Sequence, residues 1–222
     1  MRSLPSRDMA SVTAAAIRPR WRGLIHRWAA IGFVPAFAVL LAMASDGATR
    51  LAVGLHALGV IGMLGVSATY HSGRLSPEAF RLFKRLDHST ILLAIAGTYA
   101  AITVLALSGS AQTRMLVVVA VGAAIGVAIR MVWLDAPYPV VAAVYLVVGW
   151  SAVVDFPGYA EGTSATELAF IVAGGLLYTI GAVVYALHRP VLWPETFGYH
   201  ELFHSFVVAG AICHYIAVAL LL

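Results

Sequence analysis

Long apolar runs separated by short polar breaks are the main pattern along the chain. Most runs approach the 20 or so residues that a helix needs to cross a bilayer. The breaks contain serine, glycine, proline and acidic residues, which favour turns. The pattern therefore predicts seven transmembrane helices, of which the fifth is the shortest. The predicted spans are Leu24–Ala44, Leu51–Tyr70, Leu86–Leu107, Met115–Leu134, Val140–Val154, Leu168–Leu187 and His200–Leu222.

The composition agrees with a membrane location. Apolar and aromatic residues make up 61% of the 222 residues and charged residues only 11%, whereas a soluble domain carries about 25% charged residues. A soluble chain of this length could not bury so much apolar surface, so we predict an all-α, seven-transmembrane bundle over residues 23–222. Residues 1–22 are polar and basic, and they lack the apolar core of a signal peptide. We predict that they form a disordered cytoplasmic tail.

Cationic residues are distributed unequally between the two ends of the predicted bundle. Only Arg50 and Arg114 fall at the end where Asp46, Asp155 and Glu161 also lie. Cytoplasmic loops carry an excess of lysine and arginine. We therefore predict a multi-pass protein of the cytoplasmic membrane, with a cytoplasmic N-terminus and an extracytoplasmic C-terminus. The net charge of +4 does not indicate nucleic-acid binding, because the basic residues flank apolar spans instead of forming a soluble face.

Five polar residues from three predicted spans lie at one depth near the cytoplasmic end. Ser67 and His71 close the second span, Asp87 opens the third, and His200 and His204 open the seventh. Side chains four residues apart share a helix face, so each pair with that spacing points in one direction. Ionisable groups within a span are costly to insert and usually have a function. Their common depth predicts a single site.

The three histidines of this group predict a zinc site, because imidazole is the commonest metal ligand among side chains. His71, His200 and His204 would supply three nitrogen ligands to Zn²⁺ and leave the fourth tetrahedral position open for water, as in catalytic sites. Zinc lowers the pKa of such a water to about 7. Asp87 would orient the water and accept its proton, and Ser67 would hydrogen-bond the water or a developing oxyanion.

Three motifs resemble the signatures of the haemolysin III family. They are SATYH at 67–71, RLDHS at 85–89 and FGYHELFH at 197–204. This family is related to the progestin and adipoQ receptors and to the alkaline ceramidases, in a superfamily of seven-span zinc proteins. The resemblance extends from about Arg22 to the C-terminus.

The resemblance implies a cytoplasmic N-terminus and a zinc ion held by His71, His200 and His204. It also implies that Ser67 and Asp87 contact the metal-bound water. The ceramidase relatives suggest a membrane lipid as the substrate, cleaved at an amide or ester bond. We therefore expect an integral membrane zinc protein, with lipid hydrolysis as the favoured activity.

Three other functions stay open at this point. His200, Glu201 and His204 spell the zinc-protease motif, in which the glutamate is the general base; Asp87, an independent acid beside the third histidine, argues against it. A non-enzymatic haemolysin-like or receptor-like protein would use the zinc only to brace the bundle. A transporter would need an ionisable chain across the bilayer, and the outer halves of the spans are almost entirely apolar.

Further residues are expected around the site. His88 follows Asp87 and would orient a ligand from outside the metal's own ligand set. Tyr99 and His214 are candidates for the walls of a pocket. For histidines outside the triad, a structural or interfacial role is the commoner one. The histidines with no other predicted role are His26, His56 and His188.

Overall fold

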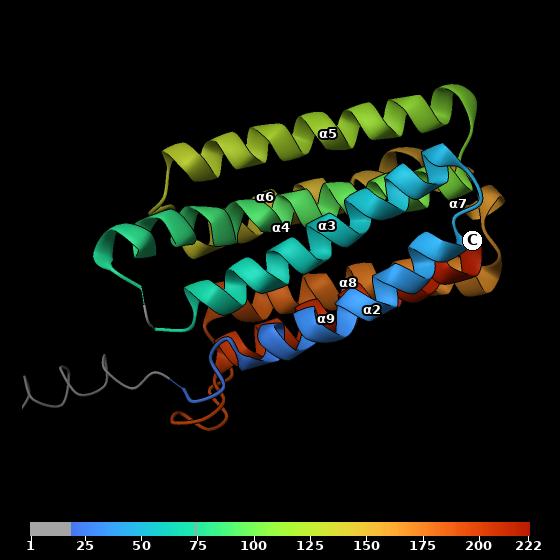
Figure 1. Cartoon of the computed structure of the whole chain (residues 1–222). Coiled ribbons are helices and arrows are strands. Elements are labelled where there is room, and N and C mark those ends of the chain that lie inside the picture. Colours follow the sequence, from blue (N-terminus) through green and yellow to red (C-terminus); the bar gives the residue numbers. More distant parts are fainter. Residues whose placement is uncertain (1–18, 74) are drawn as a thin grey trace, which may run out of the picture.

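The structure is a computed structural model that describes residues 19–73 and 75–222. Within these residues it is helical and has no strands, apart from an isolated bridge between Trp193 and Phe197. Seven of its segments are long and apolar enough to cross a membrane, and they lie side by side (Figure 1), which confirms the predicted fold class. The spans are α2 (Leu24–Met43), α3 (Gly47–Tyr70), α4 (Pro77–Ala106), α5 (Gly109–Val132), an interrupted fifth span (Tyr138–Gly162), α8 (Ala165–Leu187) and α9 (Tyr199–Leu221).

The start of α4 differs from the prediction. This helix begins at Pro77 and not at Leu86, because Ser76 caps it by accepting a hydrogen bond from the backbone N–H of Ala79. Proline is tolerated in the first turn, where its missing N–H has no helical partner. Asp87 therefore lies well inside its helix. The predicted start of this helix at Leu86 is wrong, because apolarity alone does not detect the polar first turns.

The fifth span is built from three short pieces. It consists of α6 (Tyr138–Gly149), the 3₁₀ helix η1 (Ser151–Asp155) and α7 (Phe156–Gly162), so it continues beyond the predicted end. Tyr99 on α4 bridges the break: its hydroxyl donates to the Gly149 carbonyl at 2.7 Å and accepts from the Ala152 N–H at 2.8 Å. Backbone groups inside a membrane need such internal partners, so Tyr99 makes the interruption tolerable.

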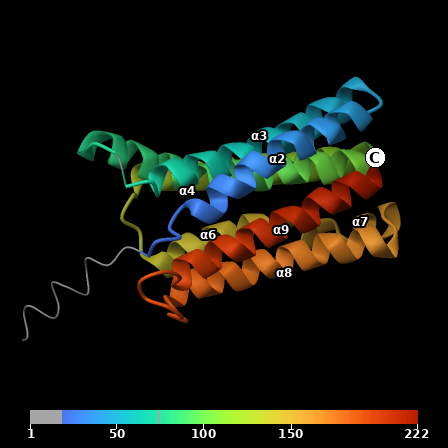
Figure 2. The same ribbon diagram turned by 60° about the horizontal axis from the view of Figure 1, so that its bottom comes forward.

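Helix α4 lies at the centre of the bundle, in contact with α3, α5, α6, α7 and α9, while α2 packs on α3 and α9 (Figures 1 and 2). Where α4 packs on α3, the backbones of the two helices are in direct contact. A Cβ atom on Gly97 would lie 2.4 Å from the Leu55 carbonyl oxygen, and one on Gly59 would lie 2.9 Å from the Ala94 Cα. Small residues permit this close approach. It holds the end of α3 beside the stretch of α4 that carries Asp87.

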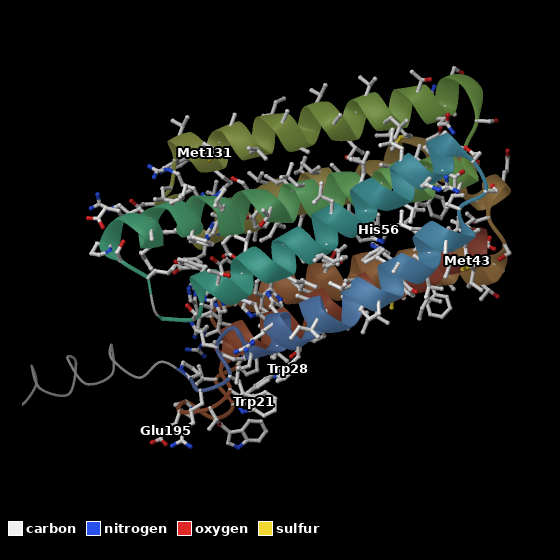
Figure 3. All side chains as sticks on the ribbon, in the orientation of Figure 1. Trp21, Trp28, Met43, His56, Met131 and Glu195 are labelled. Carbon is white, nitrogen blue, oxygen red and sulfur yellow. The ribbon has the colours of Figure 1, made fainter. Side chains whose placement is uncertain are left out.

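The first described residues and the C-terminus lie at opposite ends of the bundle (Figure 1). Residues 1–18 of the predicted tail, and Arg74, lie outside the described residues. Residues 19–22 lie against the loop before α9: the N–H groups of Arg20 and Trp21 donate to the carbonyls of Glu195 and Thr196 at 3.0 and 3.2 Å. Figure 3 shows Trp21 and Glu195 together at this end. The side of the membrane that it faces stays a prediction.

Candidate metal centre

Three imidazoles converge where α3 ends and α9 begins. His71 directly follows α3, whereas His200 and His204 lie in the first two turns of α9. The Nε2 atoms of His71 and His200 are 3.1 Å apart, although the residues are separated by 129 positions in the sequence. One ring nitrogen from each of the three residues lies within 4.8 Å of the others. The structure therefore brings together the three predicted ligands.

This donor set fits a tetrahedral divalent ion. With Zn–N bonds of about 2.0–2.1 Å, two ligand nitrogens lie roughly 3.3 Å apart, close to the observed 3.1 Å. His71 and His204 are buried, and the Nδ1 atom of His204 has no hydrogen-bond partner among the described residues. Three imidazoles can hold Zn²⁺, and other first-row divalent ions also accept them.

A carboxylate lies beside the triad. The Oδ2 atom of Asp87 is 3.9 Å from the Nε2 atom of His71, and the Ser67 side chain lies near enough to interact with the Asp87 carboxyl group. Both residues are buried. Arg85, two residues before Asp87 in the sequence, donates to the backbone carbonyl of Met131. All five predicted central residues therefore meet at the junction of α3, α4 and α9.

The five residues line one cavity of about 660 Å³, which continues into the bundle. Three further residues predicted around the site, His88, Tyr99 and His214, also lie on its wall. Their described hydrogen bonds are with residues outside the central five. The Nε2 atom of His214 lies 3.1 Å from the Ile171 carbonyl oxygen, and Tyr99 bridges the break in the fifth span. The ring of His88 lies against Arg130.

Glu201, the acidic residue of the protease-like motif, has both carboxylate oxygens engaged. Its Oε2 accepts from the backbone N–H of Gly198 at 2.8 Å, which caps α9. Its Oε1 forms an ion pair with Arg22, and the Glu201 side chain is fully buried. A general base needs a carboxylate oxygen free to take a proton. The geometry therefore argues against the protease alternative.

Comparison with known proteins identifies the family. The family described as "Haemolysin-III related" matches residues 15–215. The chain belongs to this family. Among its relatives, Hemolysin-3 of Bacillus cereus is 27% identical over 190 residues, which cover 85% of this chain and 84% of the relative. The Adiponectin receptor protein of Drosophila melanogaster is 29% identical over 184 residues, covering 75% of this chain and 41% of the receptor.

Membership of the haemolysin-III-related family confirms the resemblance derived from the three motifs. The match includes every residue of the site, from Ser67 to His204. With the seven apolar helices, it identifies a multi-pass membrane protein. The roles assigned to the individual site residues stay predictions.

Sequence reasoning missed several neighbours of the triad in this haemolysin-III-related chain. His26, expected to have only a structural or interfacial role, is buried and stacks on His204 with 3.8 Å between ring centroids and 15° between ring planes. Arg22 pairs with Glu201, and Arg130 contacts His88. His26 and Arg22 carry no local signal. Arg130 does carry one, because a lone cation inside an apolar run requires a partner.

Proposed function

We propose that this chain is an integral membrane, zinc-dependent hydrolase that cleaves an amide or ester bond in a lipid. The observation that carries the proposal is the convergence of three imidazoles beside the buried carboxyl group of Asp87, in one cavity. Three protein ligands are typical of catalytic zinc sites, whereas structural sites use four. The excess of basic residues at this end of the bundle supports a cytoplasmic site.

The protein residues divide the work of the proposed reaction. His71, His200 and His204 would hold the ion, which when bound acts as a Lewis acid and makes water more acidic. Asp87 is placed to accept a proton from the attacking water and to return it to the leaving group. Ser67, whose side chain lies beside the Asp87 carboxyl group, would hydrogen-bond that group and orient it for this transfer.

A lipid substrate is supported by the surroundings of the site. The ligands lie at the ends of membrane-spanning helices, and the cavity that contains them continues between these helices. Its deeper wall includes Ile95, Val207 and Tyr178. Mostly apolar pockets with a few convergent polar groups are typical ligand sites. The apolar part of a lipid would fit between these side chains.

The test combines metal analysis with a lipid panel. We expect the purified protein to bind about one zinc ion, and His200→Ala to lose it. We expect release of fatty acid from at least one amide- or ester-linked lipid, and Asp87→Asn to slow release by about 100-fold or more while zinc stays bound. Glu78→Gln, an exposed change in the same helix, is the matched control. Unchanged turnover in Asp87→Asn would exclude Asp87 as the base.

A non-enzymatic function is the second candidate. A metal at the triad would join the end of α3 to the start of α9, because His71 and His200 are far apart in the sequence. It would stabilise the bundle whether or not it takes part in a reaction. The relatives are named as a hemolysin and a receptor, not as hydrolases. Chelation would then lower the melting temperature of a protein that hydrolyses no member of the lipid panel.

A further inference from the structure

Arg130 is a buried cation without a carboxylate partner. It lies in the last turn of α5, is 1% exposed, and forms no ion pair within 4.0 Å among residues 19–73 and 75–222. Its two terminal nitrogens donate to the carbonyls of Trp133 and Leu134 at 2.9 and 3.0 Å. Its Nε is buried and has no hydrogen-bond partner in the described part of the chain.

Capping of α5 explains only part of this arrangement. A cation near the last carbonyls of a helix is favourable because these groups carry a partial negative charge. An exposed arginine could make the same contacts and keep its hydration. A fully buried charge needs compensation from its surroundings. For Arg130 it comes from two carbonyls and the ring of His88, while Tyr145 and the more distant carboxylate of Asp135 also interact with it. No carboxylate of the described residues pairs with it within 4.0 Å, and its Nε has no partner there, so a close negative charge would complete the compensation.

Arg130 also determines the tautomer of His88. One of its terminal nitrogens, Nη2, lies 2.7 Å from the Nδ1 atom of His88. A guanidinium group can only donate, so this Nδ1 accepts, and the His88 ring is neutral with its proton on Nε2. Both residues line the cavity that holds the histidine triad. The cavity wall therefore combines a positive charge with an N–H donor.

A second cation lies on the same wall. Lys84 lines the cavity one helical turn before His88 on α4. Its Nζ pairs with Asp135 at 2.8 Å, and the Asp135 side chain is 85% exposed. An exposed pair of this kind is weak and exchanges readily with other charged groups. Asp135 also lines the cavity, so an anion that enters beside Arg130 would replace this carboxylate as the partner of Lys84.

We propose that Arg130, His88 and Lys84 form a subsite for an anionic group, a phosphate or a carboxylate, next to Asp87. Of the five guanidinium donors of Arg130, the N–H of Nε and one N–H of Nη1 are not used by His88 or by the two backbone carbonyls, and either anion could accept from them. If the chain has the hydrolytic function proposed above, on which this step rests, its substrate is an anionic lipid. The headgroup binds at Arg130, and the bond that is cleaved lies at the triad.

Two lipids that differ only in the anionic group test the subsite. Dioleoyl phosphatidic acid and dioleoylglycerol share their acyl chains, and binding of each to the purified full-length chain is measured in detergent. We expect the wild type to bind phosphatidic acid at least about tenfold more tightly. Arg130→Gln should lose most of this preference. Arg114→Gln should keep it, because Arg114 lies at the other end of α5 and pairs with Asp155.

Inorganic phosphate distinguishes the two sources of the anion. Displacement of phosphatidic acid by millimolar phosphate would mean that the free ion occupies the subsite, and its failure to displace the lipid would mean that a lipid headgroup is required. Binding of phosphatidic acid should also weaken as the salt concentration rises. Either result of the competition supports an anion site.

Two milder variants keep the test decisive if Arg130→Gln does not fold. Arg130→Lys retains the charge but loses the unpartnered Nε donor, and Lys84→Gln removes only a partly exposed cation. Each should reduce the preference for phosphatidic acid severalfold. Equal affinity of the wild type for the two lipids, or an unchanged preference in both variants, would overturn the proposal. His200→Ala should bind no zinc and still prefer phosphatidic acid. Absence of lipid hydrolysis by the wild type would contradict the hydrolase proposal, and it would leave this lipid preference unchanged.

Discussion

The carboxylate of Glu201 is buried beside the metal site and has two partners of different kinds. The backbone N–H of Gly198 links it to the start of its own helix, and Arg22 links it to the segment that precedes α2. His200 and His204 flank it on α9, so any movement of this turn moves two of the three proposed ligands. Glu201 is therefore best described as a residue that positions the triad.

Removal of either member of the ion pair between Arg22 and Glu201 should destabilise the protein. In Arg22→Ala a buried carboxylate is left unpaired, and loss of one partner of a buried pair costs about 3–5 kcal/mol. We expect the melting temperature to fall by on the order of 10 °C in Arg22→Ala and in Glu201→Ala. The double variant should lose less than the sum of the two.

The control for this pair is Arg20→Ala, since Arg20 is exposed and its described contact with the loop before α9 is through its backbone N–H.

The variant Glu201→Gln distinguishes a positioning role of Glu201 from a catalytic one. It should retain a measurable share of any lipid hydrolysis, because its amide can still cap α9. Complete loss of turnover in a folded, zinc-loaded Glu201→Gln protein would restore the protease-like role for this residue.

At the scale of elements, the interface between α3 and α4 brings the two halves of the site together. His71 and Ser67 come from α3 and its end, and Asp87 comes from α4. The helices can approach so closely because Gly97 faces the backbone of Leu55. A backbone atom cannot rotate away as a side chain can. The distance between Asp87 and the triad therefore depends on this glycine.

A methyl group at this position should separate the two helices. In Gly97→Ala the new Cβ would lie 2.4 Å from the Leu55 carbonyl oxygen, and overpacking of this kind costs about 1–3 kcal/mol. We expect a lower melting temperature and weaker zinc binding. The matched control is Gly62→Ala on α3, where a Cβ meets nothing within 4 Å. Equal effects of the two variants would exclude close helix packing as the cause.

At the scale of the whole molecule, the asymmetry of charge predicts the orientation in the membrane. The described cationic residues of the site end include Arg20, Lys84 and Arg189, whereas Arg50 and Arg114 lie near the starts of α3 and α5, at the opposite end. Positive loops stay in the cytoplasm. The proposed hydrolase would then act on lipids from the inner side of the membrane.

Labelling of single cysteines tests this orientation. Cys213 is the only cysteine in the chain, so Cys213→Ala provides a cysteine-free background. Glu161→Cys replaces an exposed residue at the end away from the triad, and Glu78→Cys replaces one at the triad end. In intact cells an impermeant maleimide should label Glu161→Cys and spare Glu78→Cys. The reverse pattern would place the N-terminus outside and contradict the prediction.

The sequence by itself determined the number of spans, the fold class and the family. These features depend on local quantities: the length of an apolar run, the residues that interrupt it, and motifs within a few residues of one another. The pair His200 and His204 shares a face for the same local reason, since helical periodicity places side chains four residues apart on one side. His71 and Asp87 could be assigned to the site because their depth and motifs agreed.

Only the tertiary structure decided which groups surround the triad. The stacking of His26 on His204, the pairing of Arg22 with Glu201 and the contact of Arg130 with His88 each join segments that are distant in the sequence. No periodicity within one helix encodes such contacts, because they depend on how each helix is rotated and how closely it packs. The start of α4 is a different case, because an adjacent serine cap and proline encode it locally and the length of the apolar run does not detect them.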